Sequence, residues 1–311
     1  MRISDSQRYG GLVPRYQDLL ARQIKVQQQI ASGLRIQNAS DAPGDAARSH
    51  LMHTTRSTLE QNLRNLDEGQ AWTEQTNNAL NQAVSIVQRM DELSVRAGDV
   101  TLGAAERANI AQEVDQLLEG MLDVGAQTYR GRTILSGTQT GQPAFTATRD
   151  AQGRITAVTY QGNGEDRSLE VEPGRAMAYN LLGSNEAGGD FGALRDTAAG
   201  VDLFDTAIRL RDFLLANDSA SVTGISLPEL KDALTHLTTG LARVGGLQSR
   251  MNQSELTDED HLELVQKQLS QLIETDLAEA AVEASELDVA YRAALQVGSR
   301  IMQTSLLDYL R

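Results

Sequence analysis

Apolar residues recur every three or four positions along two long stretches of the chain that contain no proline. These stretches run from Ala46 to Gln142 and from Glu229 to Arg311. Proline costs a helix interior about 3 kcal/mol, so its absence permits long helices there. Three runs alternate steps of four and three: Ala79, Ala83, Ile86, Met90, Leu93, Ala97; Ile110, Val114, Leu117, Met121, Val124; and Leu230, Leu234, Leu237, Leu241, Val244. This 3.5-residue repeat predicts coiled-coil seams.

The first seam turns polar in its middle, and a turn follows it. A run of residues spaced three or four apart is apolar at both ends and polar at Gln70, Thr73 and Asn77. Its members are Leu59, Leu63, Leu66, Gln70, Thr73, Asn77, Leu80, Val84 and Val87. Polar seam positions usually fix register and partner number at some cost in stability. Gly98–Gly103 predicts the turn of a helical hairpin.

Two short motifs predict helix starts in the second stretch. Ser226 and Glu229, with Pro228 between them, form the pattern of a capping box with proline in the first turn. Thr257 with Asp260 is a weaker example of the same pattern. The acidic cluster around Asp258 also suits a helix N-terminus, where the helix dipole favours negative charge.

The middle of the chain changes to alternating, glycine-punctuated sequence. Phe145–Arg149, Arg154–Tyr160 and Arg167–Glu172 predict short strands. Gly183–Gly192 predicts a flexible loop, and a helix returns over Val201–Ala216. The fold class is therefore mainly α: a long coiled-coil rod formed by N- and C-terminal segments, with a small β-rich insertion in the middle.

Both ends of the chain predict helices with small apolar faces. The N-terminal stripe is Val13, Tyr16, Leu20, Ile24, Ala31 and Leu34, interrupted by Gln27; the C-terminal stripe is Leu277, Ala280, Ala284, Leu287, Tyr291, Ala294, Gly298 and Ile301. An isolated helix with so small a face is marginal in water, but small residues allow close helix approach. Residues 1–50 carry a net charge of +3 and residues 255–311 carry −8. Either the terminal helices meet, or the acidic residues merely coat a solvated face.

Charge and composition exclude several classes of function. The net charge of −14 argues against nucleic acid as the main partner. No apolar run approaches the roughly 18 residues of a membrane helix, and we expect no cleaved secretory signal. Cysteine is absent, and His50 with His53 makes no metal site. Asp41–Asp45 lacks the alternating oxygen ligands of a calcium loop. We therefore expect an assembly subunit, not an enzyme, with no cofactor or metal.

Two segments near opposite ends resemble a known family. Ser32–Pro43, with the sequence SGLRIQNASDAP, resembles the hallmark segment of bacterial flagellins and their hook-associated relatives. It departs from that pattern at Gln37, where the family usually has Asn, and at Ala42, where it usually has Asp. Glu274–Ala280 followed by Ala293–Gln303 is similar to the other hallmark, in the family's order.

Three further features resemble the hook-associated members of the family rather than the filament subunits. They are the start Met1–Ser4, the segment Tyr129–Thr140 followed by Pro143 and Phe145, and the end Ser305–Leu310. This resemblance implies a structural subunit of the bacterial flagellum that forms an adaptor ring between hook and filament. The alternatives are the flagellin filament subunit and, from another class, a cytosolic coiled-coil scaffold.

The resemblance also implies an architecture and partners. Residues 1–45 and 256–311 would form the inner terminal-helix domain, 46–137 and 200–255 the rod, and 138–199 the outer β-rich insertion. The implied partners are further copies of the chain, hook-associated protein 1 on the hook side, flagellin, the flagellar type III export apparatus and a cytoplasmic export chaperone. The chain would be secreted to the extracellular flagellum. The candidate assembly-interface residues are Leu20, Ile24, Leu34, Arg35, Ile36, Leu277, Leu287, Val297, Ile301, Leu306, Leu307, Tyr309 and Leu310.

Overall fold

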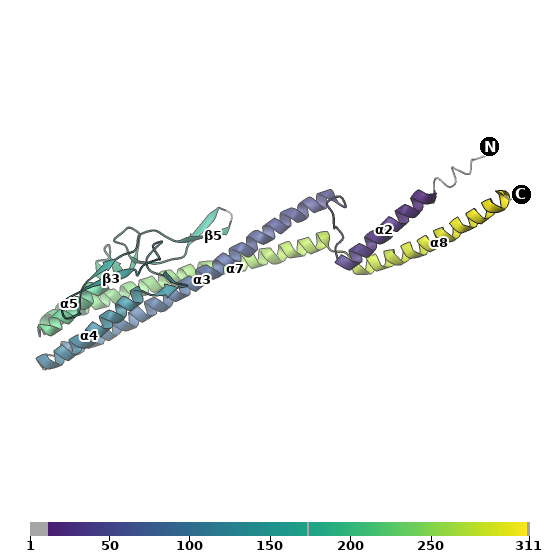
Figure 1. Cartoon of the computed structure of the whole chain (residues 1–311). Coiled ribbons are helices and arrows are strands. Elements are labelled where there is room, and N and C mark those ends of the chain that lie inside the picture. The colour runs from purple at the N-terminus through teal and green to yellow at the C-terminus, as the bar shows by residue number, and fades with distance from the viewer. Residues whose placement is uncertain (1–11, 173, 310–311) are drawn as a thin grey trace. The chain divides into compact units, whose positions relative to one another are not determined.

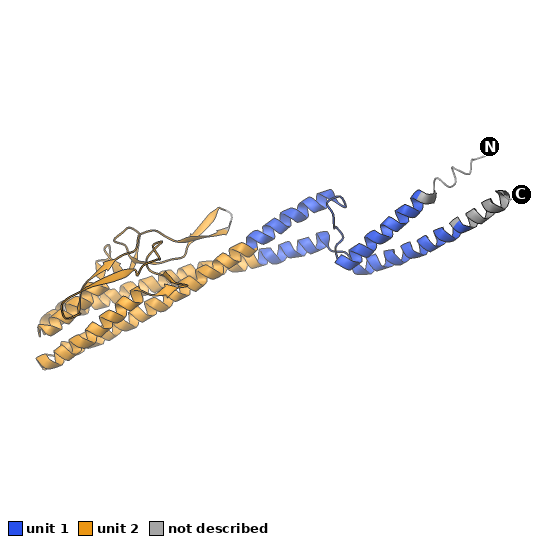
Figure 2. Cartoon of the chain, in the orientation of Figure 1, with its two compact units in different colours: residues 1–59, 260–311 blue, residues 60–259 orange. Residues whose placement is uncertain are grey.

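The computed structural model describes residues 12–172 and 174–309, and most of them are helical (Figure 1). The helices are α2 (Leu12–Ser32), α3 (Pro43–Ala97), α4 (Ala104–Gly125), α5 (Leu203–Leu215), α6 (Ser219–Ser221), α7 (Leu227–Ile273) and α8 (Leu277–Tyr309). The chain divides into two compact units, residues 1–59 with 260–311 and residues 60–259 (Figure 2). The mainly α fold class with a small β-rich middle region is confirmed. The division into three domains stays a prediction.

The long helices of the second unit bury the seams that the sequence predicts, with small shifts in phase. Ala83, Met90 and Leu237 are fully buried. In α4, however, Leu118 is fully buried whereas Leu117 lies only partly buried at the edge of the same core. The predicted turn Gly98–Gly103 is confirmed, since α3 ends at Ala97 and α4 begins at Ala104.

Two threonines in and beside the polar part of the α3 seam are buried, and their hydroxyl groups bond within their own helix. Thr73 and Thr76 are each 1% exposed. Their hydroxyl groups donate to the carbonyl oxygens of Gln70 and Trp72, at 2.9 and 3.0 Å. Because each hydroxyl bonds to a carbonyl of α3 itself, neither pays the free-energy cost of a buried, unpaired hydroxyl, and neither needs a partner on another helix.

An aromatic cluster joins α3 to the β-rich region. Trp72 makes edge-on contacts with Tyr129 and Tyr179, with ring centroids 6.1 and 5.9 Å apart. The guanidinium of Arg167 lies 4.6 Å from the Trp72 ring centroid, and Arg167 Nε donates to the Tyr179 hydroxyl at 2.8 Å. Such edge-to-face and cation–π contacts stabilise beyond simple burial.

Within the described residues, nine short strands form four small sheets. Antiparallel pairs join β1 (Thr128–Tyr129) to β2 (Arg132–Thr133), β3 (Phe145–Arg149) to β4 (Ile155–Tyr160), and β5 (Ser168–Glu172) to β6 (Arg175–Ala178); β7 (Leu182–Ser184), β8 (Gly192–Asp196) and β9 (Val201–Asp202) form a three-stranded sheet. The three predicted strands are confirmed. Phe145 and Ile155 are buried in the same core as α4 and α5, so the strands pack on the helices rather than forming a core of their own.

The segment Gly183–Gly192 is not wholly the flexible loop that its glycines suggest. Its ends belong to β7 and β8, which pair in parallel. Gly183, Ser184 and Gly192 are all buried. A Cβ on Gly192 would lie 1.9 Å from the Arg195 carbonyl oxygen, so glycine is required here by close backbone approach.

Of the two predicted helix starts in the second stretch, the first is confirmed in position, since α7 begins at Leu227, but its capping box is wrong, and the second start, at Thr257, is wrong. A π-helical turn, Val222–Ser226, runs directly into α7, and the buried hydroxyl of Ser226 has no hydrogen-bond partner among the described residues. Asp218 caps this segment instead, since its carboxylate accepts from the Ser221 N–H at 3.1 Å. Thr257 and the acidic cluster lie within α7, where the Thr257 hydroxyl donates to the Gln253 carbonyl oxygen.

Candidate assembly interface

The terminal helices α2 and α8 lie side by side in the unit of residues 1–59 and 260–311 (Figure 1). The Tyr16 hydroxyl donates to the Ala294 carbonyl oxygen, and Val26 is 4% exposed. The more buried positions of α2 are Tyr16, Leu19, Gln23, Val26, Gln29 and Ile30, and those of α8 are Ala280, Ala284, Leu287, Asp288, Tyr291 and Ala294. From Ala280 to Ala294 the C-terminal stripe is therefore the paired face, as its spacing indicates. Leu277 lies outside that face, and the burial of Gly298 and Ile301 lies outside what the structure describes. The N-terminal stripe is wrong in part, because Leu20 and Ile24 lie outside the paired face.

Several apolar candidates are exposed in the single chain. Leu20 and Ile24 on α2 are 44% and 46% exposed, and Leu277 and Val297 on α8 are each 55% exposed. Exposed aliphatic side chains are ordinary when single, but here they accumulate on one helix pair. Val282, Val289 and Leu295 add to the exposed apolar surface of α8.

The remaining candidates divide into two groups. Leu287 is half-buried on the paired face, and Leu34 and Ile36 are half-buried in the connection between α2 and α3. Ile301, Leu306, Leu307 and Tyr309 belong to α8, but their side chains, like the whole of Leu310, lie outside the described residues.

The two breaks in the helices of this unit are hydrogen-bonded to each other. Arg35 N–H donates to the Ile273 carbonyl oxygen at 2.7 Å, and Thr275 N–H donates to the Gly33 carbonyl oxygen at 2.9 Å. Gly33 has φ +71°, the left-handed conformation that glycine adopts without strain at a helix end. We call residues 33–45 together with 272–276 the clasp.

Charged side chains fix the clasp. One Arg35 guanidinium nitrogen donates to the Leu272 carbonyl oxygen at 2.7 Å and to the Asp45 carboxylate at 3.0 Å. Asp41 accepts from Lys25 Nζ at 2.9 Å and from the Asn38 N–H at 3.0 Å. The hydrogen bond from Lys25, followed by that from the Asn38 backbone, lowers the pKa of Asp41 to about 2.

Three residues of this site escaped the sequence reasoning. Lys25, Asp41 and Asp45 hold the clasp together with Arg35, the single clasp residue among the charged candidates. The sequence signal for Asp41 and Asp45 is the presence of two carboxylates within ten residues of Arg35, and no such signal points to Lys25. Asp276 also contributes, since its carboxylate accepts from the Ala278 N–H at 2.8 Å and so caps α8.

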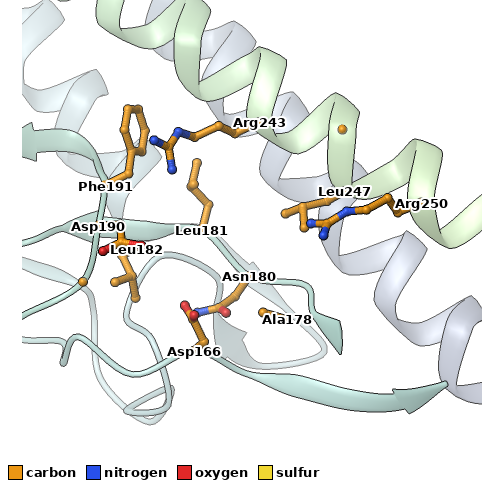
Figure 3. Close-up of a pocket in the computed structure, with 12 residues that line it drawn as sticks. Asp166, Ala178, Asn180, Leu181, Leu182, Asp190, Phe191, Arg243, Leu247 and Arg250 are labelled. Atoms are coloured by element: carbon orange, nitrogen blue, oxygen red, sulfur yellow. The ribbon is translucent and has the colours of Figure 1, made fainter. Parts of the chain in front are cut away.

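The other unit contains a hollow of about 620 Å³ beside α7 (Figure 3). Arg243 and Arg250 of α7 line one side, and Asp166 and Asp190 line the side formed by the β-rich region. The Arg243 guanidinium lies 4.5 Å from the Phe191 ring centroid. With both charges represented on its walls, the hollow has no marked preference for a free anion or cation.

Neither metal binding nor membrane insertion finds support in the described residues. Among them, no group of three or more His, Cys, Asp or Glu side chains is arranged to hold a metal ion. No described helix combines the length and the apolar character needed to cross a bilayer.

Comparison with known families decides what kind of protein has this helical frame. A family model for the bacterial flagellin N-terminal helical region matches residues 19–140, and one for the C-terminal helical region matches residues 227–310. Together the two matches make up more than half of the chain. The chain belongs to the bacterial flagellin family. Between the two matches lies most of the β-rich region, including strands β3 to β9.

Curated flagellin relatives differ in how much of their length the chain spans. The flagellar filament 41 kDa core protein of Borreliella burgdorferi is 23% identical over 294 residues, covering 87% of this chain and 88% of that protein. A Salmonella berta flagellin is 27% identical over 211 residues, covering 66% of this chain but only 39% of that protein. The chain thus spans about two fifths of the Salmonella flagellin.

Solved structures share the fold at low sequence identity. One, from Vibrio parahaemolyticus and described as flagellar hook-associated, has a TM-score of 0.65 at 17% identity and covers 75% of this chain and all of that one. Flagellar hook-associated protein 3 from Legionella pneumophila has a TM-score of 0.59 at 15% identity, covering 72% of this chain and 98% of that one.

Proposed function

We propose that this flagellin-family chain is a structural subunit of the bacterial flagellum, placed as an adaptor ring between hook and filament. The observation that carries the proposal is the fold match to hook-associated proteins, which extends over nearly the whole of the Vibrio and Legionella chains. The three sequence features shared with hook-associated members, at both ends and at the entry to the β-rich region, support the same assignment.

The terminal helices are the part that joins the subunit to its neighbours. Leu20 and Ile24 on α2, with Leu277 and Val297 on α8, expose apolar surface that a single chain leaves in water. Fully burying an exposed aliphatic side chain contributes about 1.5–3 kcal/mol, and about half of each of these side chains is still exposed, so packing against adjacent subunits would stabilise both chains. Leu34, Arg35 and Ile36 belong to the clasp, and in this proposal they take part in the same contact with adjacent subunits.

The proposal names partners and a location. Further copies of the chain complete the ring, hook-associated protein 1 lies on the hook side, and flagellin lies on the filament side. The chain leaves the cell through the flagellar type III export apparatus after a cytoplasmic chaperone has held it. Its role is mechanical rather than enzymatic, and its place is the extracellular flagellum.

Deletion of the gene tests the proposal. A strain that lacks a junction subunit should build hooks and release unpolymerised flagellin into the medium, and a plasmid copy of the gene should restore filaments. The filament subunit is the second candidate, because the Borreliella filament protein aligns over most of both chains. A strain that lacks its only filament subunit would release no flagellin, and that result would overturn the junction assignment.

A further inference from the structure

The hairpin of β5 and β6 has a hollow against each of its strands. One, of about 380 Å³, is lined by β6 and α7 and includes Arg250, Gln253 and Met177. The other, of about 240 Å³, is lined by β5 and α3 and includes Asn65 and Glu68. Among the described residues that line the α7 hollow, none is acidic.

The two flanks of the hairpin carry opposite charges. Arg250 is exposed and has no ion-pair partner among the described residues, although the chain as a whole carries −14. On the α3 flank, Asp67, Glu68 and Glu74 are likewise exposed and unpaired within the described part of the chain. Arg64 lies one turn from Glu68 on α3 and Glu255 lies five residues from Arg250 on α7, but neither forms an ion pair with these two groups in the described part of the chain. Glu68 and Arg250 therefore each remain available to a counter-charge on a neighbouring copy.

The acidic and basic groups also lie at the same level along the helices. Gln70 of α3 donates to Asn252 at 3.2 Å and to Glu255 at 2.6 Å, both on α7. A Cβ on Gly69 would lie 3.2 Å from the Met251 sulfur. Residues 67–74 of α3 thus run beside residues 250–255 of α7. Copies placed side by side at one height would bring the acidic flank of one to the basic flank of the next.

We propose that the α3 flank of one copy docks on the α7 flank of the next, with Glu68 facing Arg250. The contact rests on the proposed function and specifies how neighbouring subunits meet within the ring. It joins two different surfaces, so it is heterologous and can continue from copy to copy until the ring closes. The charges set the register, while Met177, which lies partly exposed beside Arg250, supplies apolar surface to bury.

Cysteine cross-linking tests this contact, because the natural chain has no cysteine. The variant carries Glu68→Cys and Arg250→Cys and replaces the natural chain in cells. Flagella are isolated and oxidised with copper phenanthroline, and the chain is detected on non-reducing gels. We expect a ladder of products larger than dimers that collapses to monomers on reduction. The matched control carries Asp123→Cys and Lys231→Cys, two exposed positions that line neither hollow, and should give no ladder.

The outcomes separate the contact from the function on which it rests. If the chain is present in isolated flagella but gives no ladder, the contact is wrong and the junction role stands. If the chain is absent from flagella, both are wrong. A dimer formed by Glu68→Cys alone would indicate a two-fold contact and overturn the heterologous one.

Charge exchange provides a second measurement that needs no oxidation. Glu68→Arg and Arg250→Glu should each reduce the number of filaments per cell severalfold. The double variant restores the charge pair in reversed order and should recover most of the loss. Failure of the double variant to improve on either single variant would contradict the proposed pairing.

Discussion

Neighbouring leucines of α4 show how much a single position along the seam matters. Leu118 is fully buried in the core, whereas Leu117 lies partly buried at its edge. Replacing a buried leucine by alanine removes its transfer free energy and leaves a cavity. Leu118→Ala should therefore lower the free energy of unfolding by about 2–5 kcal/mol, and Leu117→Ala should cost less than half as much. Denaturant unfolding of both variants measures the difference, and equal losses would contradict the burial that the structure assigns.

The Asp41 carboxyl provides a residue-scale test of the clasp. Its pKa of about 2 lies below the usual 3.8, so its contribution to stability is present above about pH 4 and is lost as the pH falls towards 2. Lys25 provides the largest cause of the shift. Lys25→Met should raise the pKa of Asp41 towards 3.8, measured by NMR titration of the carboxyl carbon. Lys267→Met, a change at an exposed lysine of α7, should leave it at about 2. An unchanged value in the Lys25 variant would refute the contact.

The sequence predicts the composition of the terminal helices better than their orientation. On α8 the residues from Ala280 to Ala294 recur in steps of four and three, and the pairing with α2 follows from that spacing, although Val282 and Val289 leave further apolar surface exposed. The N-terminal helix offers two overlapping stripes, one through Leu20 and Ile24 and one through Leu19 and Val26. Only packing against α8 selects the second. The clasp could not be predicted from local sequence, because Arg35 donates to the carbonyl oxygen of Leu272, which lies 237 positions away in the chain.

At the scale of elements, the main departure from the sequence prediction is that a π turn, rather than a capping box, precedes α7. Pro228 has no N–H, so an uninterrupted α-helix would leave the Gly224 carbonyl without its donor. The chain instead forms the π turn Val222–Ser226, in which the Leu227 N–H donates to the Val222 carbonyl oxygen. A proline that usually marks a helix start here marks a local widening of a continuing helix.

This arrangement reverses the expected effects of two substitutions. Asp218→Ala removes the carboxylate that caps the segment and should cost about 0.5–2 kcal/mol of unfolding free energy. Ser226→Ala should be neutral or slightly stabilising, because the buried hydroxyl has no partner to lose. Thermal unfolding of both variants measures the two effects. A larger loss of stability for Ser226→Ala than for Asp218→Ala would indicate that Ser226, and not Asp218, caps the helix.

The short strands show where pattern reading succeeds and where it ends. Phe145–Arg149 and Ile155–Tyr160 alternate around a turn that ends in Gly153, so a local hairpin follows from the sequence. Strands β7 and β8 pair in parallel across the intervening segment and have only three and five residues. Their pairing depends on burial against helices from elsewhere in the chain, which no local window contains.

At the scale of the whole molecule, the fold and the family agree on an assembly subunit with long helices from both ends of the chain. The helical segments that match the family include both hallmark segments, and the clasp joins those segments by hydrogen bonds. The ion pairs of the clasp join charges within the N-terminal segment, Lys25 with Asp41 and Arg35 with Asp45, and so do not use the opposite net charges of the two ends. Sequence therefore predicts the class of molecule, while the contacts that hold its ends require three dimensions.

Gold-labelled antibody against this chain, viewed by electron microscopy on intact flagella, tests the junction role most directly. The proposed function predicts a single narrow band of label where the hook meets the filament, and no label in a strain that lacks the gene. Label spread along the filament would identify a filament subunit instead, and label confined to the cell interior would contradict a flagellar location altogether.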